Sequence, residues 1–225
     1  MAHVPDILFQ SNHVLIINKP AGLACHPGAS GAKREAGPSV EDFFPLWRRG
    51  HDGPWLAHRL DADTAGCLMV ARRKTALCAI QDGFRTGAVR KMYAAIVRGV
   101  PTAACGVIEA PLAKRRNAQG WRVVVDPAGQ AARTVWRVWA VAAGRALLEL
   151  RPETGRTHQL RVHCAAMGHP IIGDPVYGAG IKDGDVGGLS LLARQLELVL
   201  QGEAIRAEAP WSPAMRAAWR EALPD

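Results

Sequence analysis

The sequence predicts an α+β fold with flanking helices and a mixed, mostly antiparallel sheet. Segments with strand character follow one another in runs, which disfavours strict alternation of strands and helices. Turn residues such as Pro20-Ala-Gly22 and Asp126-Pro-Ala-Gly129 separate neighbouring apolar runs. The 225 residues show no repeat, linker or shift in composition. We therefore expect a single domain over residues 1–225.

Each element is predicted from its local pattern. Short apolar or alternating runs predict strands, and apolar residues at helical spacing predict helices. The expected strands cover residues 14–19, 66–71, 89–97, 121–125, 132–141 and 145–150. The expected helices run from the residue after Ser39 to Trp47 and over residues 74–84, 157–167 and 213–223. Ser39 and Thr157 are the predicted N-caps, because a hydroxyl can accept a hydrogen bond from the first turn.

Charge and hydropathy favour a protein that binds nucleic acid and disfavour a membrane protein. Lysine and arginine outnumber the acids by 28 to 20, a net charge of +8, and they cluster at residues 48–49, 72–74, 90–91 and 114–116. Such an excess attracts polyanions, nucleic acid above all. No apolar run approaches the roughly 20 residues of a membrane helix, and the N-terminus lacks the features of a signal peptide. We expect a cytoplasmic protein without a membrane partner.

Metal and nucleotide motifs are missing from the sequence. The five cysteines are scattered without a C-x-x-C pair, and we interpret them as small apolar side chains. His158, His163 and His169 lack the spacing of a zinc-binding H-E-x-x-H motif, so we expect no metal. Neither a phosphate-binding P-loop nor a G-x-S-x-G hydrolase motif occurs.

Two acids lie close together in the stretch AHRLDADTAG, residues 57–66. If this stretch is extended, Asp61 and Asp63 share a face, as a pair of carboxylates for glycoside-type chemistry requires. Asp63-Thr-Ala-Gly66 is also typical of an Asx-type turn, in which the acid serves the backbone. The turn favours Asp61 as the reactive acid, although the residues alone leave the choice open.

Two further stretches combine cations with an aromatic ring or a helix entrance. In RKMYAAIVRG, residues 90–99, Lys91 and Tyr93 fall on one strand face, which suits a stacked base beside a phosphate or, equally, a core tyrosine. Arg156 precedes the helix predicted from residue 157, where free N–H groups favour anions. Arg161 follows within its first turns, near His158, and is placed to pair with a carboxylate.

Taken together, HRLDADTAGCLMVA, KMYAAIVRG and TGRTHQLRVHCAAMGHPIIGDPVYG resemble the signature motifs of the RluA-type RNA pseudouridine synthases. NKPAGLACHPG, residues 18–28, is similar to the N-terminal motif of that family, and the likeness runs from about residue 12 to residue 215. The resemblance implies a sheet split by an RNA-binding cleft. It also implies isomerisation of uridine in RNA to its C-glycoside without cofactor or metal.

The resemblance also implies roles for single residues. Asp61 matches the family's nucleophile, and Tyr93 the tyrosine that stacks on the target uracil. Arg161 matches the salt-bridge partner of the catalytic acid, with Arg156 as the alternative. We expect the RNA to be contacted by Arg59, Lys91, Arg156 and His158.

Some features depart from the family or stay open. Thr64-Ala65-Gly66 replaces the usual Thr-Ser-Gly, and Leu191-Leu192-Ala193 replaces Leu-His-Ala. We expect no S4-type RNA-binding domain and a monomer that acts on ribosomal or transfer RNA. Attack at C1′ and a glycal route are both open. The competing hypotheses are a non-catalytic RNA chaperone and a hydrolase that uses Asp61 with Asp63.

Overall fold

The computed structural model describes residues 3–27, 37–49, 52–117, 120–178, 187–219 and 223–224. The chain divides into two compact units. Unit 1 holds residues 1–91 and 193–210, and unit 2 holds residues 92–192 and 211–225. Strands β5 (Arg90–Arg98) and β11 (Leu191–Leu200) each contain the boundary between the units. The expectation of one catalytic domain stays a prediction.

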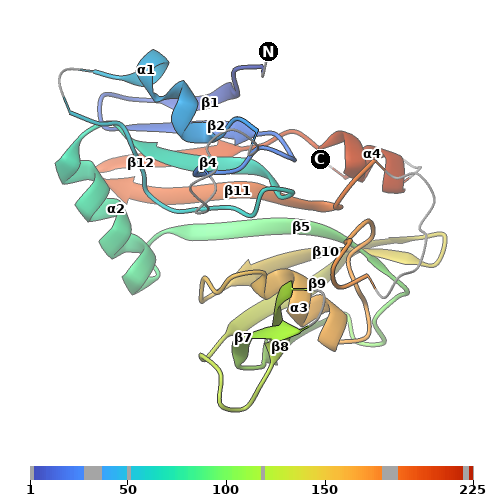
Figure 1. Cartoon of the computed structure of the whole chain (residues 1–225). Helices are drawn as coiled ribbons and strands as arrows, with labels where there is room; N and C mark the ends of the chain where they lie inside the picture. Colours follow the sequence, from blue (N-terminus) through green and yellow to red (C-terminus); the bar gives the residue numbers. More distant parts are fainter. Residues whose placement is uncertain are drawn as a thin grey trace. The chain divides into compact units, whose positions relative to one another are not determined.

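Unit 1 contains a sheet built around β4 (Ala65–Ala71), whose seven residues are all buried. An apolar run of this kind suits a strand that is covered on both faces. β2 (Val14–Lys19) and β3 (Trp55–Leu56) pair with β4 in antiparallel fashion, and β1 (Asp6–Gln10) pairs with β2 (Figure 1). β11 is the other neighbour of β4, and β12 (Glu203–Glu208) pairs with β11.

The helices of unit 1 begin and end near the predicted residues. The turn η1 (Val40–Phe43) and α1 (Phe44–Trp47) follow Ser39, whose N–H donates to the Asp42 carboxylate at 2.7 Å in a capping box. α2 (Lys74–Thr86) buries Ala76, Leu77 and Ile80 and ends at Gly87, which has a φ of +78°. The predictions for Ser39 and for residues 74–84 are confirmed.

Unit 2 contains a second antiparallel arrangement, with strands in the order β5, β10 (Arg145–Pro152), β9 (Arg133–Ala142) and β6 (Cys105–Glu109). Leu160 and Cys164 of α3 (Gln159–Ala166) pack against Leu148 and Leu150 of β10. A separate hairpin of β7 (Leu112–Asn117) and β8 (Gly120–Val125) packs on the other side of α3 (Figure 1). α3 therefore lies between the sheet and the hairpin. The C-terminal helix α4 spans Pro213–Trp219.

The predicted α+β class is confirmed, and so are the strands that local periodicity indicated. The N-cap predicted at Thr157 is wrong, because His158 adopts a left-handed conformation (φ +53°) and α3 begins only at Gln159. Residues 220–222 of the predicted last helix lie outside the described residues. The sequence analysis missed β1, β3, β6, β7, β11 and β12. In β7, three consecutive cations mask the strand pattern.

Cys25, Cys67 and Cys164 are buried, as small apolar side chains should be, but Cys78 and Cys105 are exposed, so that interpretation is wrong for these two. Within the described residues, no three His, Cys, Asp or Glu side chains are grouped so that they could hold a metal ion. None of the helices in the described part of the chain is long and apolar enough to cross a bilayer.

Candidate active site

Asp61 is the first residue of a tight turn whose backbone is held by hydrogen bonds from Thr64, Gly22 and Lys19. The Thr64 N–H donates to the Asp61 carbonyl oxygen at 3.1 Å. The carbonyl oxygen of Ala62 accepts from Lys19 Nζ at 2.7 Å and from the Gly22 N–H at 2.9 Å. The turn lies at residues 61–64 rather than at Asp63–Gly66, because β4 already begins at Ala65. The two acids are therefore not alternate residues of an extended strand, and only Asp63 is exposed.

Lys19 is the residue that ties this turn to the N-terminal motif. Its side chain is fully buried at the end of β2, and Nζ also donates to the carbonyls of Pro20 (2.9 Å) and Leu23 (2.7 Å). Burial lowers the pKa of the Lys19 ammonium to about 8, although Cys25, Asp63 and Asp61 act to raise it. Because its ammonium donates to three backbone carbonyls, Lys19 holds the loop in place and does not act as a surface charge.

His58 supports the same segment from the side of β4. The Met69 N–H donates to His58 Nε2 at 3.0 Å, so this nitrogen carries no proton. Burial, with a smaller effect of the Lys91 charge, lowers the pKa of His58 to about 3. The centre of the His58 ring lies 4.8 Å from that of the Phe84 ring, and Lys91 Nζ lies 5.6 Å from the centre of the Phe84 ring. His58 is therefore a neutral structural side chain at neutral pH.

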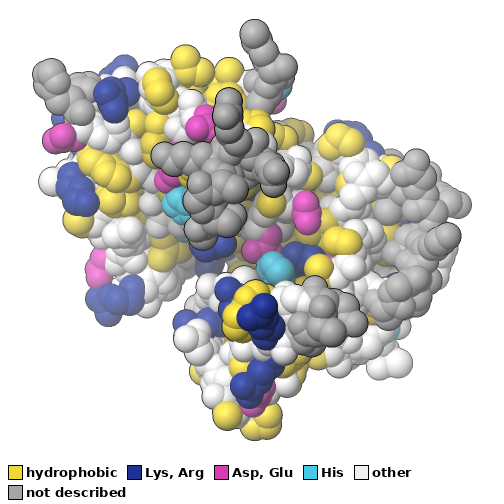
Figure 2. Space-filling view, in the orientation of Figure 1, with side chains coloured by type: hydrophobic (Ala, Val, Ile, Leu, Met, Phe, Trp, Pro, Cys, Tyr) yellow, Lys and Arg dark blue, Asp and Glu magenta, His cyan; other side chains and the backbone are white. Residues whose placement is uncertain are grey.

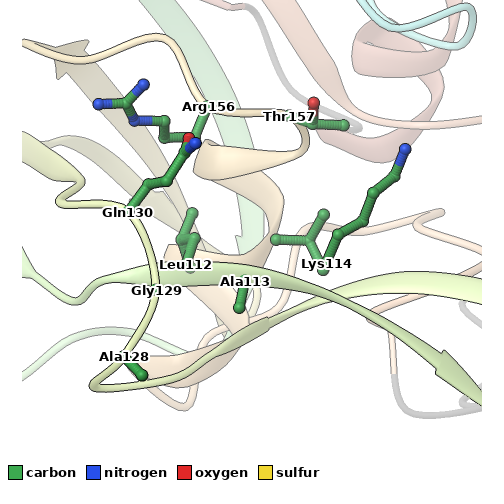
Figure 3. Close-up of a pocket in the computed structure, with 9 residues that line it drawn as sticks. Leu112, Ala113, Lys114, Ala128, Gly129, Gln130, Arg156 and Thr157 are labelled. Atoms are coloured by element: carbon green, nitrogen blue, oxygen red, sulfur yellow. The ribbon is translucent and has the colours of Figure 1, made fainter.

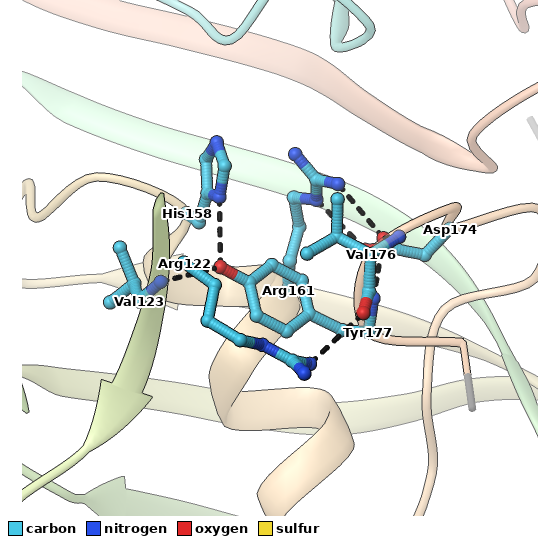
Figure 4. Close-up of polar contacts among 7 residues, drawn as sticks. All are labelled: Arg122, Val123, His158, Arg161, Asp174, Val176 and Tyr177. Carbon is cyan, nitrogen blue, oxygen red and sulfur yellow. Dashed lines mark hydrogen bonds and ion pairs between the residues drawn. The ribbon is translucent and has the colours of Figure 1, made fainter. Parts of the chain in front are cut away.

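In unit 2, Arg161 makes a buried ion pair with Asp174. Its Nε and Nη2 atoms each donate to one carboxylate oxygen at 2.8 Å, and the exposed fractions of the two side chains are 3% and 0% (Figure 4). Burial alone would raise the pKa of Asp174, but Arg161 and the N–H groups of Tyr177 and Val176 lower it overall. The carboxylate predicted for Arg161 from its residue type is thus present, although the sequence analysis did not single out Asp174.

Tyr177 extends this pair toward the hairpin. Arg161 Cζ lies 5.2 Å and Arg122 Cζ 5.4 Å from the centre of the Tyr177 ring. The Tyr177 hydroxyl lies 2.9 Å from His158 Nδ1 and accepts from the Val123 N–H at 3.1 Å (Figure 4). His158, whose backbone is left-handed, is therefore held at the entrance of α3 by its bond to Tyr177.

Gln159, the first residue of α3, holds the chain that precedes the helix but does not cap its first turn. Its Oε1 accepts from the Arg156 N–H at 3.0 Å and from the Thr154 hydroxyl at 2.7 Å. Its Nε2 donates to the Arg133 carbonyl and the Thr134 hydroxyl, both at 3.0 Å. The buried glutamine therefore fixes the entrance of α3, from which Arg161 projects.

The predicted site residues fall into both units. Asp61, Arg59 and Lys91 belong to unit 1, with Arg59 exposed and Lys91 half-buried. Tyr93, Arg156, His158 and Arg161 belong to unit 2. Tyr93 is half-buried against the core of that unit, and Arg156 is exposed, with Nε donating to the Ala131 carbonyl at 3.1 Å. The pairing of Arg161 or Arg156 with Asp61 stays a prediction.

Sequence reasoning missed Lys19, Asp174 and Gln159 as supports of the site. The signals were present: a lysine directly before Pro-Ala-Gly, and an acid before Pro-Val-Tyr-Gly, each at the end of an apolar run. Neither signal names its partner, because the partners of Lys19 and Asp174 lie up to 43 and 13 residues away.

Comparison with known proteins gives a consistent assignment. Residues 13–166 match the RNA pseudouridylate synthase family. An uncharacterized RNA pseudouridine synthase of Zymomonas mobilis is 42% identical over 214 residues, which cover 91% of this chain and 92% of that protein. Ribosomal large subunit pseudouridine synthase C of Vibrio cholerae is 41% identical over 172 residues, or 76% of this chain and 52% of that protein.

A solved structure supports the same assignment at the level of the fold. Human RNA pseudouridylate synthase domain containing 4 matches with a TM-score of 0.77 and 29% identity, over 97% of this chain and 94% of that chain. The sequence motifs, the family match and this likeness agree. The chain belongs to the RNA pseudouridylate synthase family and is an RNA pseudouridine synthase of the RluA type, an isomerase that acts on RNA.

Proposed function

We propose that this enzyme converts uridines of ribosomal RNA to pseudouridine, with Asp61 as the nucleophile. The name of the Vibrio cholerae relative supports ribosomal RNA of the large subunit as the substrate. Transfer RNA is the other substrate to test. Cytoplasmic location, a monomeric state and the lack of a cofactor stay predictions.

The anchored turn is the observation that carries the assignment to Asp61. A carboxylate in water is a poor nucleophile. Catalysis therefore depends on how well the carboxylate is aimed. The Thr64 N–H holds the Asp61 carbonyl, and the bonds from Lys19 and Gly22 to the Ala62 carbonyl hold the following peptide, between Ala62 and Asp63. A rigid support of this kind suits a nucleophile, and of the two acids in the turn Asp61 is half-buried whereas Asp63 is exposed, which favours Asp61.

The proposed reaction breaks the bond between C1′ and N1 of the uridine and forms a bond between C1′ and C5. Asp61 either attacks C1′ or removes a proton to give a glycal. The detached uracil rotates while the Tyr93 ring stacks on its face. After C5 bonds to C1′, the C5 proton leaves to solvent and N1 takes up a proton. No other reactant is needed, because the product is an isomer of the substrate.

The proposed role of Arg161 is to keep the catalytic acid ionised in a desolvated site. Arg161 uses two of its five N–H groups on Asp174, and a planar guanidinium can serve a second carboxylate at the same time. Arg59 is proposed to fill the space of the flipped nucleotide, and the basic side chains Lys91 and Arg156 to hold phosphates. His158, bonded to Tyr177, is proposed to contact the RNA from the entrance of α3.

The test is tritium release from RNA that carries 5-tritiated uridine. Asp61→Asn is expected to abolish release and to leave RNA binding within a few-fold of wild type. Asp63→Asn, in the same turn, is the matched control and should keep its activity. Release by Asp61→Asn would show that the nucleophile is a different group. Pseudouridine mapping of ribosomal and transfer RNA, from cells with and without the gene, identifies the substrate.

A further inference from the structure

The β7–β8 hairpin combines an exposed tryptophan with an unusual density of cations. The Trp121 side chain is 63% exposed, although tryptophan is largely buried in most proteins. Lys114 Nζ lies 5.8 Å and Arg116 Cζ 6.0 Å from the centre of its ring. The chain from residue 112 to residue 125 contains four cations and no acid. Figure 2 shows Lys and Arg side chains gathered around hydrophobic ones at the place of this hairpin.

The charge pattern of the hairpin works against its own stability. Arg115 and Arg122 lie directly opposite each other across the two strands. Like charges in that position are destabilising. Arg115 is compensated by an ion pair with Asp126, and Arg122 by the Val176 carbonyl and the Tyr177 ring. Lys114 and Arg116, in contrast, lie opposite Val123 and Trp121 rather than opposite an acid. The pattern therefore points to an anionic partner.

The hairpin is nevertheless held firmly against α3. Leu112 and Val123 are buried against Val162 and Tyr177, and the Val123 N–H donates to the Tyr177 hydroxyl. Arg122 Nη2 donates to the Val176 carbonyl at 3.0 Å. An aromatic ring on a rigid support binds with a smaller loss of conformational entropy than one on a free loop.

A groove of about 430 Å³ lies at the base of the hairpin. Leu112 and Ala113 form its floor, and Lys114 and Arg156 stand on opposite sides of it (Figure 3). Lys114 belongs to both features, because its ammonium lies near the Trp121 ring and its side chain lines the groove. Lys114 therefore links the Trp121 ring to a groove that is lined by apolar side chains and by the cations Lys114 and Arg156.

We propose that Trp121, Lys114, Arg116 and the adjoining groove, here called the hairpin platform, bind single-stranded RNA. One base stacks on the Trp121 ring, and Lys114, Arg116 and Arg156 hold phosphates on either side of it. Aromatic rings interleaved with cations are the means by which proteins hold single strands without reading a fixed sequence. The inference rests on the proposed function and adds an RNA contact outside the reacting groups.

The first test measures binding of a labelled single-stranded RNA of about 12 nucleotides, within the usual size of a single-strand site. Trp121→Ala is expected to weaken binding by about five- to 140-fold, the loss of one stacked base. Trp121→Phe, which retains an aromatic face, should recover most of the affinity. Leu46→Ala removes a side chain of similar exposure, 65%, from α1 and should have no effect. A duplex of the same sequence should lose little affinity in any variant.

The second test separates phosphate binding from stacking. The double variant Lys114→Gln, Arg116→Gln should reduce the slope of log affinity against log salt by about 0.7 for each phosphate that is no longer neutralised. Arg85→Gln, which removes an exposed cation from α2, should leave the slope unchanged. Equal slopes for wild type and the double variant would overturn the phosphate assignment.

Activity measurements distinguish this inference from the proposed function. Trp121→Ala should raise KM for ribosomal RNA and leave the rate at saturating RNA within a few-fold of wild type. If wild-type protein produces no pseudouridine, the proposed function fails whatever the hairpin does. If wild type is active and Trp121→Ala binds and reacts with RNA like wild type, the inference is overturned, and an acidic protein becomes the partner to test.

Discussion

Replacing Asp174 with asparagine removes one charge from the buried ion pair of unit 2 and leaves the volume of the side chain nearly unchanged. The carboxylate accepts four hydrogen bonds: two from Arg161, one from the Val176 N–H at 2.8 Å and one from the Tyr177 N–H at 3.0 Å. An asparagine oxygen can keep the backbone bonds. The asparagine NH2 group then takes the place of the oxygen that accepts from Arg161 Nε, so two donors face each other.

The expected effect is large because the Arg161 charge stays behind without its partner. Removing one member of a buried ion pair costs about 3–5 kcal/mol, whereas a domain is stable by only about 5–15 kcal/mol. For a chain of this size each kcal/mol lowers the unfolding temperature by about 2–4 °C. We therefore expect Asp174→Asn to unfold roughly 6–20 °C below wild type.

Thermal unfolding followed by circular dichroism measures this difference. Asp82→Asn breaks the exposed pair with Arg85 on α2 and serves as the control, with an expected loss of less than about 1 kcal/mol. The decisive comparison repeats Asp174→Asn in an Arg161→Met background. There the carboxylate is the uncompensated charge, so its removal should be neutral or stabilising. An equal loss in both backgrounds would show that the effect of Asp174 does not depend on the Arg161 charge, and would refute the reasoning.

The same pair predicts a dependence on pH. The pKa of Asp174 is lowered in the folded protein, so its stabilising effect is complete above the pKa of the unfolded chain, about 4. The effect is lost as pH falls through the lower pKa of the folded state. The gap between wild type and Asp174→Asn should therefore be full at pH 7 and shrink below about pH 4.

Three further changes test the supports of the Asp61 turn, each by urea unfolding. Between pH 7 and pH 11, the free energy of unfolding of wild type should rise by about 3 kcal/mol relative to that of Lys19→Met. The reason is that Lys19 has a pKa of 10.5 in the unfolded chain and of about 8 in the folded protein, so the unfolded chain holds the proton to higher pH. A constant difference between the two proteins would contradict the buried ammonium. Wild type should lose stability as pH falls from 6.5 to 4, because the unfolded chain protonates His58 below its pKa of 6.5 whereas the folded protein does so only near pH 3. His58→Gln should lose less stability over the same range. Parallel curves of unfolding free energy against pH for the two proteins would contradict that pKa. Gly66→Ala places a Cβ against the Ala193 carbonyl oxygen at a φ of +108°, and should lower the free energy of unfolding by more than about 3 kcal/mol. Gly22→Ala, at a φ of +85° but with open space around the Cβ, should lower it by about 1–2 kcal/mol. Equal losses would rule out the close approach at Gly66.

Local patterns were sufficient for part of this protein. The apolar run of β4 and the helical spacing in α2 depend only on which face of an element is buried, and that periodicity is written in neighbouring residues. The same holds for the capping box at Ser39. The motifs around Asp61, Tyr93 and Arg161 likewise lie in short stretches of chain, so the family and its proposed catalytic residues could be predicted from sequence.

The supports of those residues needed the tertiary structure. Lys19 reaches the Ala62 carbonyl across 43 residues, and Gly66 lies against Ala193 because β11 is the neighbour of β4. The pattern of a strand specifies its faces but not its neighbours, so such contacts depend on strand order and register. Periodicity was also misleading at the start of α3, because His158 adopts a left-handed backbone and bonds to Tyr177, 19 residues away, and the helix begins only at Gln159.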